Sequence, residues 1–569
     1  MKQGRKYGAV SLGSIMLLSL IASACSNSAD KPEASTAATA AAAGTTAKPT
    51  TEVAVKPMTK YDPPIEVTTV RSVDASFKYA AGDSIDSNIW TKIFEQDYGI
   101  KVKNVWSVDG TQYHQKLNVS IASGDIPDFL EVNKEEMKRL ADAGMLEDLT
   151  KVWEQYSTPF LKSLMSQDQG IGLKAATIDG KLLGIPHTFS NGGVSTAEML
   201  YVRTDWLKKL NLPEPQSMDD VFKIATAFAK QDPDGNGKAD TIGLAVNKDF
   251  LDYGHGSLRG FFNSYHAFTD IFIKDAAGKI VYGSVQKELK EPLKKLQELY
   301  KDGILDKEFG VKPPAKIQED VAAGRVGLAY GYVSDAGYIQ KENHTKDPKA
   351  QWKAFPLLSI DSKPAIPQLY DTANTFYVVK KGAKHPEAAI NLANIYTNRF
   401  YEKSYAPDPN PFITDTKTGI MPAKYAPVSL DPLNLNLEAF GLVQAAIKAG
   451  DGSKLGFPAS IHFDRVSKYL AGDDSQWGGN FVMGEGGSYS VIDKYNKAKL
   501  GQYNLFLAPA TPTMSEKLPT LKKKVAETFT KIIMGDSSID EFDKFADEYK
   551  KLGGDKIDQE VNDWYAKNK

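Results

Sequence analysis

The chain alternates short apolar runs with longer runs in which apolar residues recur every three or four positions. Residues 65–73, 100–108 and 126–132 form the short runs. Residues 87–99 and 113–125 form the longer runs, and the second of them ends at Gly124. These patterns are typical of strands and of amphipathic helices, respectively. The order strand, helix, strand, helix, strand predicts a parallel β-sheet with right-handed crossovers, and therefore α/β architecture.

The same alternation continues to the end of the chain. Helices are predicted over residues 218–232, 288–303 and 385–400, and a strand over residues 374–382. Asp219 and Asp220 lie in the first turn of the helix at 218–232, where negative charge favours the helix dipole. The sequence ends in two helices that meet at Gly553 and Gly554. We find no internal repeat with the period of a solenoid.

The first 24 residues have the organisation of a secretory signal peptide. Basic residues at the start are followed by an apolar run from Ala9 to Ala24, which is too short for a comfortable membrane span. Cys25 follows directly and resembles the lipidated cysteine of a bacterial lipobox. Ala22 stands where leucine is usual, so cleavage by ordinary signal peptidase and release of a soluble protein is the alternative. Residues 25–60 are expected to be the lipidated Cys25 and a disordered tether, since residues 26–60 are rich in Ala, Thr, Lys and Pro.

Composition limits the possible functions of the remaining domain, residues 61–569. The chain has 69 Lys and Arg against 71 Asp and Glu, which gives no reason to expect a nucleic acid as partner. Cys25 is the only cysteine, so the mature domain has no disulfide. The seven histidines are scattered, and neither a Gly-x-Ser-x-Gly elbow nor a phosphate loop is present. No catalytic residue is therefore predicted.

One local motif indicates a metal site. The segment from Asp232 to Thr241 places oxygen ligands at alternating positions, as the first part of an EF-hand loop does. The predicted ligands of a structural Ca²⁺ are Asp232, Asp234, Asn236, the backbone carbonyl of Lys238, and Asp240. The twelfth position is Gly243 where an EF-hand has Glu, so the usual bidentate ligand is absent. The alternative is a polar turn without an ion.

Five segments together resemble the extracellular solute-binding proteins that serve sugar ABC transporters, in particular their large lipoprotein branch in Gram-positive bacteria. They are residues 117–132, 199–244, 322–331, 380–396 and 529–565, and they follow the family's order along nearly the whole mature chain. The resemblance implies an α/β, two-lobe periplasmic-binding-protein-like clamshell of type II with a ligand cleft between the lobes. Crossings between the lobes are expected near Asn191, Tyr330 and Val379. Lobe 1 would then comprise about residues 61–191 and 330–379, and lobe 2 about residues 192–329 and 380–569.

The implied fold places several polar and aromatic residues at the cleft, and each of them also fits plain packing. The candidates are His187, Asn191, Arg203, Tyr330, Tyr332, Tyr370, Asp371, Asn374 and Trp477. Ser190 is a further candidate beside His187. Trp477 lies among glycines in a segment predicted to be a loop, where an indole face suits stacking on a sugar.

The expected function is capture of an oligosaccharide and its delivery to the permease subunits of an ABC importer, without breaking a bond. The protein is expected to be a monomer on the extracellular face of the cell membrane, held there only through acylated Cys25. A secreted glycan-degrading lyase or hydrolase is one alternative. A surface sensor or adhesion accessory protein with the same clamshell is the other.

Overall fold

The computed structural model describes residues 56–74, 77–402, 411–412 and 418–568. Cys25 and most of the expected tether lie outside the described residues. Every described element belongs to one compact unit, Val55–Lys569. Within the described residues, no helix is both long and apolar enough to span a membrane.

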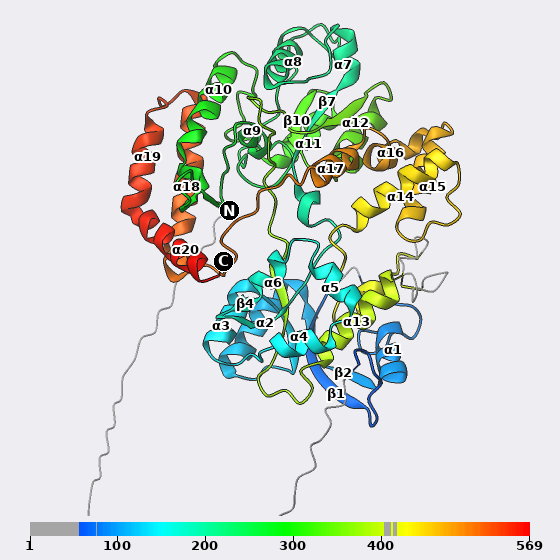
Figure 1. Ribbon diagram of the computed structural model, residues 1–569. Coiled ribbons are helices and arrows are strands. Elements are labelled where there is room, and N and C mark those ends of the chain that lie inside the picture. Colours follow the sequence, from blue (N-terminus) through cyan, green and yellow to red (C-terminus); the bar gives the residue numbers. More distant parts are fainter. Residues whose placement is uncertain (1–55, 75–76, 403–410, 413–417, 569) are drawn as a thin grey trace, which may run out of the picture. The chain divides into compact units, whose positions relative to one another are not determined.

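A first hydrophobic core, which we call the first core, collects buried side chains from 67–185, 373–430 and Leu507. Its elements are β1 (Ile65–Val73), α1 (Ile89–Tyr98), β2 (Ile100–Asp109), α2 (Gly110–Ser123), β3 (Phe129–Asn133), α3 (Lys134–Asp142), α4 (Thr150–Tyr156), α5 (Pro159–Met165), α6 (Ile171–Ala175), β4 (Thr177–Ile178), β5 (Lys181–Leu182), β6 (Ile185–Pro186), β12 (Thr375–Val379) and α13 (Ala388–Tyr401). β1 pairs with β2 in parallel, as predicted (Figure 1).

The third predicted strand pairs differently from the expectation. β3 is hydrogen-bonded antiparallel to β12, and the sheet order is β3-β12-β6. The start of β3 is tied to β1 by side chains, because Asp128 accepts hydrogen bonds from the backbone N and the Oγ1 of Thr68 at 2.8 and 2.7 Å. The predicted parallel sheet is therefore confirmed for its first two strands only.

A second hydrophobic core, the second core, collects buried side chains from 197–369 and 437–561. Its elements are β7 (Met199–Arg203), α7 (Thr204–Lys209), α8 (Met218–Lys230), α9 (Arg259–Ser264), β8 (Phe272–Lys274), β9 (Ile280–Tyr282), α10 (Lys290–Lys301), α11 (Pro314–Ala322), β10 (Leu328–Gly331), α12 (Lys341–Lys346), β11 (Trp352–Phe355), α14 (Leu435–Ala449), α15 (Ala459–Leu470), α16 (Trp477–Met483), α17 (Ser488–Lys497), α18 (Pro512–Met534), α19 (Glu541–Tyr549) and α20 (Asp555–Lys567). β7 is the central strand of an antiparallel sheet in the order β10-β7-β11.

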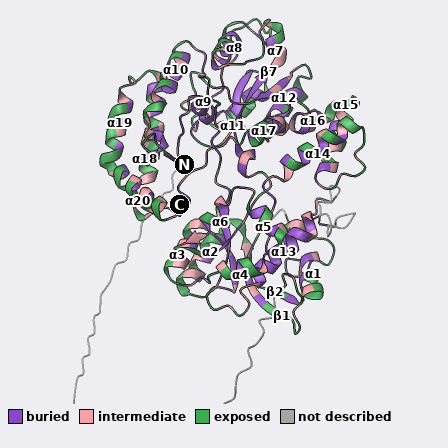
Figure 2. Ribbon diagram, viewed as in Figure 1, coloured by how far each residue is buried: buried purple, intermediate pink, exposed green. Residues whose placement is uncertain are grey.

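The predicted helices are present as α1, α2, α8, α10, α13, α19 and α20. Ser217 caps α8, since its side chain accepts a hydrogen bond from the backbone N of Asp220. Gly553, with φ of 107°, lies in the turn between α19 and α20, where a residue with a Cβ atom would be strained. α13 is buried along nearly its whole length (Figure 2).

The two cores divide the chain at places other than the expected lobe boundaries. Tyr330 lies on β10, which pairs with β7, so this segment remains in the second core up to Leu369. The chain re-enters the first core at Ala373, and α13 then packs there instead of in the second core. The passages between the cores therefore fall in residues 186–196, 370–372 and 431–436 and beside Leu507.

Candidate ligand-binding site

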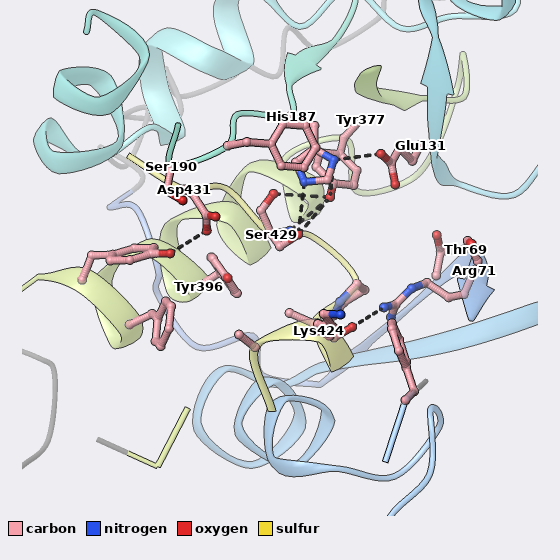
Figure 3. Close-up of a pocket in the computed structure, with 18 of the residues that line it drawn as sticks. Thr69, Arg71, Glu131, His187, Ser190, Tyr377, Tyr396, Lys424, Ser429 and Asp431 are labelled. Atoms are coloured by element: carbon pink, nitrogen blue, oxygen red, sulfur yellow. Dashed lines mark hydrogen bonds and ion pairs between the residues drawn. The ribbon is translucent and has the colours of Figure 1, made fainter. Parts of the chain in front are cut away.

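A cavity of about 480 Å³, which we call the first cavity, opens on the first core (Figure 3). Strands β1, β3 and β12, the segment after β6, the end of α13 and residues 423–435 provide its walls. The polar side chains that line it are Thr69, Arg71, Ser72, Tyr113, Glu131, His187, Ser190, Tyr377, Tyr396, Tyr401, Lys424, Ser429 and Asp431. The volume lies in the range of small-molecule binding sites.

Strand register brings the central side chains of the cavity together. Glu131 of β3 and Tyr377 of β12 are direct cross-strand partners, so their side chains lie on one face of the sheet. His187 follows β6, and its backbone N donates a hydrogen bond to the carbonyl of Thr375 on β12 at 3.0 Å. Three segments far apart in the sequence thus place Glu131, His187 and Tyr377 side by side.

These three residues and Ser429 form a hydrogen-bond network. His187 Nδ1 lies 2.8 Å from Glu131 Oε1, and His187 Nε2 lies 3.4 Å from Ser429 Oγ. Burial acts to raise the pKa of Glu131, but hydrogen bonds from His187 and Thr375 and the nearby charges of His187 and Arg71 hold it below the ordinary value. Glu131 is therefore an ionised acceptor, which favours a proton on Nδ1 of His187 and leaves Nε2 facing the hydroxyl of Ser429.

Asp431 is a second carboxylate on the wall. Tyr401 donates a hydrogen bond from its hydroxyl to Asp431 Oδ1 at 2.5 Å. The backbone of Asp431 is fixed to Thr188 by two bonds, of 3.0 Å from its N to the Thr188 carbonyl and of 2.7 Å from Thr188 Oγ1 to its carbonyl. Burial raises the pKa of Asp431, while the Tyr401 hydrogen bond and the charge of His187 oppose that change.

The cavity also offers a cation and an exposed ring. Arg71 donates from Nη1 to the carbonyl of Tyr425 at 3.2 Å and from Nη2 to that of Lys424 at 3.4 Å. Among the described residues, no carboxylate lies within ion-pair distance of Arg71 or Lys424. Phe189 is 54% exposed and lies against the His187 ring at a centroid distance of 4.4 Å. An apolar ring face beside hydrogen-bonding groups matches the two kinds of surface that a sugar presents.

Of the residues expected from the sequence, His187 and Ser190 line the first cavity. Asn191 is the next residue and lines an adjoining cavity of about 470 Å³, which we call the second cavity. Its Oδ1 accepts hydrogen bonds from Asn436 Nδ2 at 2.7 Å and from the Tyr489 hydroxyl at 3.0 Å.

The other expected residues are distributed over the second core and its junction with the first. Tyr370 is 45% exposed and packs edge-on against Tyr253 at 5.1 Å. Asp371 forms an ion pair with Lys134 at 3.0 Å. Asn374, which follows in the same segment, is exposed. These three residues line neither cavity.

Arg203, Tyr330, Tyr332 and Trp477 are buried, and Tyr330 and Trp477 belong to the second core. Arg203 Nε donates to Asp205 at 2.8 Å, and the Tyr332 hydroxyl donates to Glu198 at 2.7 Å. The Tyr330 hydroxyl lies 3.8 Å from the sulfur of Met218.

Trp477 is not on a loop, because it is the first residue of α16. Its indole is 4% exposed and stacks on His344 at a centroid distance of 4.4 Å and an interplanar angle of 9°. The protein itself thus covers the ring face that the sequence suggested for a sugar.

Sequence reasoning missed Arg71, Glu131, Tyr377, Lys424, Ser429 and Asp431. Glu131 is a charged residue within the apolar run of the third predicted strand, and this break in the pattern could have marked Glu131 as a candidate site residue. Tyr377 lies in a strand with no comparable break. Ser429 and Asp431 come together with β12 only through the path of the chain after α13, which no local pattern indicates.

The loop from Asp232 to Asp240 is held by its own side chains. Asp232 accepts hydrogen bonds from the backbone N of Gly235, Asn236 and Gly237 at 3.1, 3.1 and 3.0 Å. Asn236 Nδ2 donates to Asp234 Oδ2 at 2.8 Å and to Asp240 Oδ1 at 2.9 Å.

Two carboxylates of this loop therefore converge on one nitrogen. Burial and the neighbouring Asp232 raise the pKa of Asp234. Throughout the described part of the chain, no group of three or more His, Cys, Asp or Glu side chains could hold a metal ion. Any ion here would rely on the Asn236 side chain and on the carbonyl of Lys238, whose N donates to Asn236 Oδ1 at 2.8 Å.

Two curated relatives match about half of the chain. Lipoprotein LipO of Bacillus subtilis (strain 168) is 29% identical over 258 residues, which are 45% of this chain and 49% of LipO. The fructooligosaccharide ABC transporter substrate-binding protein FusA of Streptococcus pneumoniae serotype 4 is 26% identical over 260 residues, which are 43% of this chain and 46% of FusA. The chain thus spans about half the length of the curated relatives that it matches.

Solved structures match nearly the whole chain. The HMO-binding, ABC-transporter-associated solute-binding protein of Bifidobacterium longum infantis has a TM-score of 0.59 at 18% identity, over 89% of this chain and 99% of that one. An EF-hand mutant of FusA in complex with fructo-nystose has a TM-score of 0.51 at 17% identity, over 88% of this chain and 99% of that one. At these identities the similarity shows the fold, and it confirms the predicted α/β solute-binding protein fold.

The family itself is shown by the sequence. Residues 90–406, more than half of the chain, match the model of the bacterial extracellular solute-binding proteins. This range includes β3, β12 and α13, and with them Glu131, His187 and Tyr377 of the first cavity. The chain therefore belongs to the bacterial extracellular solute-binding protein family.

Proposed function

We propose that this protein captures an oligosaccharide outside the cell and delivers it, unmodified, to the permease of an ABC importer. The observation that carries the proposal is the first cavity, where the exposed ring of Phe189 lies beside the network of Glu131, His187 and Ser429. A pyranose packs its C–H face against a ring and donates its hydroxyls to acceptors in the same plane. The two relatives that are described as binding oligosaccharides or HMO support this ligand class.

The acceptors are fixed before the ligand arrives. The ionised Glu131 is oriented by His187, and Asp431 by Tyr401 and the backbone of Thr188. Preorganised acceptors bind hydroxyls with less loss of entropy than mobile ones, because the side chains need not be ordered on binding. We propose that Glu131, His187, Ser429 and Asp431 bind the sugar hydroxyls, and that Arg71 binds a ring or carbonyl oxygen.

Delivery to a permease requires that the protein stay near the membrane. Cys25 follows a signal-like segment, and a curated relative is named a lipoprotein. We propose that acylation of Cys25 anchors the protein and that residues 26–60 hold the domain off the membrane. Mass spectrometry of membrane-extracted protein tests this: a diacylated or triacylated Cys25 supports anchoring, and an unmodified N-terminus downstream of residue 24 contradicts it.

Binding itself is tested by thermal unfolding of the purified protein with a panel of neutral and acidic oligosaccharides, followed by chromatography of the sugar. A ligand that binds only the native state at about a hundred times its Kd adds about 2.7 kcal/mol to the free energy of unfolding. A saturable rise in Tm with the sugar recovered intact is the expected result. A sugar that is consumed, or a Tm unchanged by every member of the panel, contradicts the proposal.

We also infer that the loop from Asp232 to Asp240 binds Ca²⁺. All its donors are oxygens, as Ca²⁺ prefers, and the Asn236 amide nitrogen lies where two carboxylates converge, the position that suits a cation. Rotation of this amide by half a turn would present its oxygen instead. In the described conformation the carboxylates of Asp232, Asp234 and Asp240 do not form a metal-binding group, so binding requires that they rearrange around the ion together with Asn236 and the carbonyl of Lys238. The charge of the ion would then stabilise the turn.

The test compares Tm in excess Ca²⁺ and in excess chelator for the wild type and for Asp234→Asn. We expect a Ca²⁺-dependent rise that the substitution removes, with an unchanged rise in Glu135→Gln, an exposed acid on α3. Equal Tm values for the wild type in Ca²⁺ and in chelator would show that the loop is a polar turn.

A further inference from the structure

The second cavity differs from the first in charge. It is lined by Lys341 and Arg465, and none of its lining residues is acidic. Among the described residues, neither of these side chains has an ion-pair or hydrogen-bond partner within the protein. Both side chains are exposed, and an anion that binds in this cavity would be attracted by each of the two charges.

Two consecutive glycines of α16 contact the aliphatic stems of these two cations. A Cβ atom at Gly478 would come within 2.7 Å of Lys341 Cδ, and one at Gly479 would come within 3.1 Å of Arg465 Cβ and 3.2 Å of its Cδ. The aliphatic stem of each cation therefore lies directly on the backbone of α16. Consecutive Cα atoms are about 3.8 Å apart, so the stems of Lys341 and Arg465 contact α16 within a single helical turn.

The remaining lining resembles that of a sugar site. Tyr338 is 74% exposed at this cavity, and Asn191, Asn436, Ser334 and Gln476 offer amides and hydroxyls. The ring of Tyr338 can pack on an apolar sugar face, and the amides can donate and accept. The cavity thus combines groups for hydroxyls with two unpaired positive charges.

The two cavities are neighbours. Ser190 lines the first and Asn191 the second, and in the same way Leu435 lines the first and Asn436 the second. The hydrogen bond of 2.7 Å from Asn436 Nδ2 to Asn191 Oδ1 joins the two boundary segments. The two cavities therefore share a boundary made by residues 190–191 and 435–436, and our proposal requires that an extended ligand spans it.

We propose that the second cavity binds an anionic group of the oligosaccharide, so that the physiological ligand is an acidic sugar chain. This inference rests on the proposed function, whose ligand it narrows. The planar fork of Arg465 suits a carboxylate, as in a uronate, and equally a sulfate or phosphate ester. Lys341 supplies a second, less directional charge. The neutral part of the chain lies in the first cavity.

The experiment measures Kd by calorimetry for a panel of tetrasaccharides: uronates, their neutral methyl esters, sulfated galactans and unmodified neutral sugars. We expect the tightest ligand to be anionic and its methyl ester or desulfated form to bind about ten- to a hundredfold more weakly, as for loss of a charged hydrogen bond. The uronate and sulfate arms identify which anionic group is bound.

Variants assign the effect to this cavity. Arg465→Gln and Lys341→Gln should each weaken the anionic ligand about tenfold or more and leave the neutral one within about threefold. Lys448→Gln, an exposed lysine of α14 outside both cavities, changes the net charge equally and should have no effect. Unchanged Tm values show that the variants are folded.

The outcomes separate this inference from the proposed function. If a neutral sugar binds most tightly, or if the glutamine variants weaken acidic and neutral ligands equally, the second cavity does not recognise an anion, while the oligosaccharide function stands. If no oligosaccharide of any charge binds, the proposed function fails, and this inference fails with it.

Discussion

The two cavities use charge in opposite ways. In the first, the carboxylates already have protein partners, since Glu131 contacts His187 and Asp431 accepts from Tyr401. In the second, Lys341 and Arg465 have no partner among the described residues. The first is therefore a preorganised set of acceptors, and the second an uncompensated positive surface.

This difference in charge pairing determines which part of a ligand each cavity can select. The fixed acceptors of the first cavity form hydrogen bonds with sugar hydroxyls, and these bonds contribute a similar binding free energy for neutral and acidic sugars. The unpaired cations of the second cavity add binding free energy only when the ligand carries an anion, and salt screens that contribution. Affinity should therefore depend mostly on the first cavity, and discrimination by charge on the second.

The largest effect is expected from Trp477, which lies next to the glycines that carry the two cations. Trp477→Ala removes a buried indole that stacks on His344, and should lower the free energy of unfolding by about 3–5 kcal/mol. Denaturant unfolding measures this loss. The control, Tyr338→Ala, removes an exposed ring and should change stability by no more than about 0.5 kcal/mol. A Trp477→Ala protein of normal stability that has lost ligand binding would instead make Trp477 a stacking platform.

Acid should lower the free energy of unfolding through His462, which lines the second cavity. Burial, together with the charge of Arg465, lowers the pKa of His462 to about 4. Between pH 6.5 and pH 4 the unfolded chain then binds a proton that the folded one does not, so stability falls as the pH falls through this window. The full loss is at most about 3 kcal/mol, reduced by the partial exposure of the ring.

The measurement is the free energy of unfolding at pH 7.5 and 4.5 for the wild type and for His462→Gln. The variant should lose less stability than the wild type on acidification, since it has no ring to protonate. Equal losses in the two proteins would mean that His462 titrates normally.

Phe189 should affect affinity and not stability. Its ring is 54% exposed at the first cavity, so Phe189→Ala leaves the core intact. We expect Kd for neutral and acidic sugars alike to rise about tenfold or more, as for an aromatic anchor at an interface. Val105→Ala, which shortens an exposed apolar side chain on β2, is the control for calorimetry. An effect on acidic sugars alone would contradict the division of roles between the cavities.

Local patterns were sufficient for most helices and for the family, and insufficient for the site. The spacing of apolar residues predicted α8, α10 and α13, and ordered motifs identified a solute-binding protein that is not an enzyme. His187 was found because it follows a recognisable segment. Glu131 and Tyr377 meet only through the antiparallel register of β3 and β12. The sequence pattern predicted a parallel sheet for β3 and gave no pairing for β12.

Trp477 shows a second limit of such reasoning. Its glycine neighbours indicate a loop by composition, since glycine lowers helix propensity. Gly478 and Gly479 are nevertheless helical, and the absence of a Cβ atom lets the stems of Lys341 and Arg465 pack directly on the helix backbone, a requirement that exists only in the folded protein. Tertiary packing therefore decides the conformation at the position where composition is most misleading.

The smallest effect, and the sharpest test of the second cavity, is expected from Gly479→Ala. In a helix this change favours folding by about 0.5–1 kcal/mol, but here the new Cβ would lie 3.1 Å from Arg465 Cβ. The gain in helix propensity and the crowding against Arg465 should nearly cancel in the free energy of unfolding. The displaced guanidinium of Arg465 should raise Kd for an acidic ligand a few fold. Gly441→Ala on α14 is the matched control, because no atom lies within 4 Å of its Cβ: it should stabilise the protein and leave Kd unchanged. If both alanines stabilise equally and neither changes Kd, the position of the Arg465 stem on α16 has no part in recognising charge.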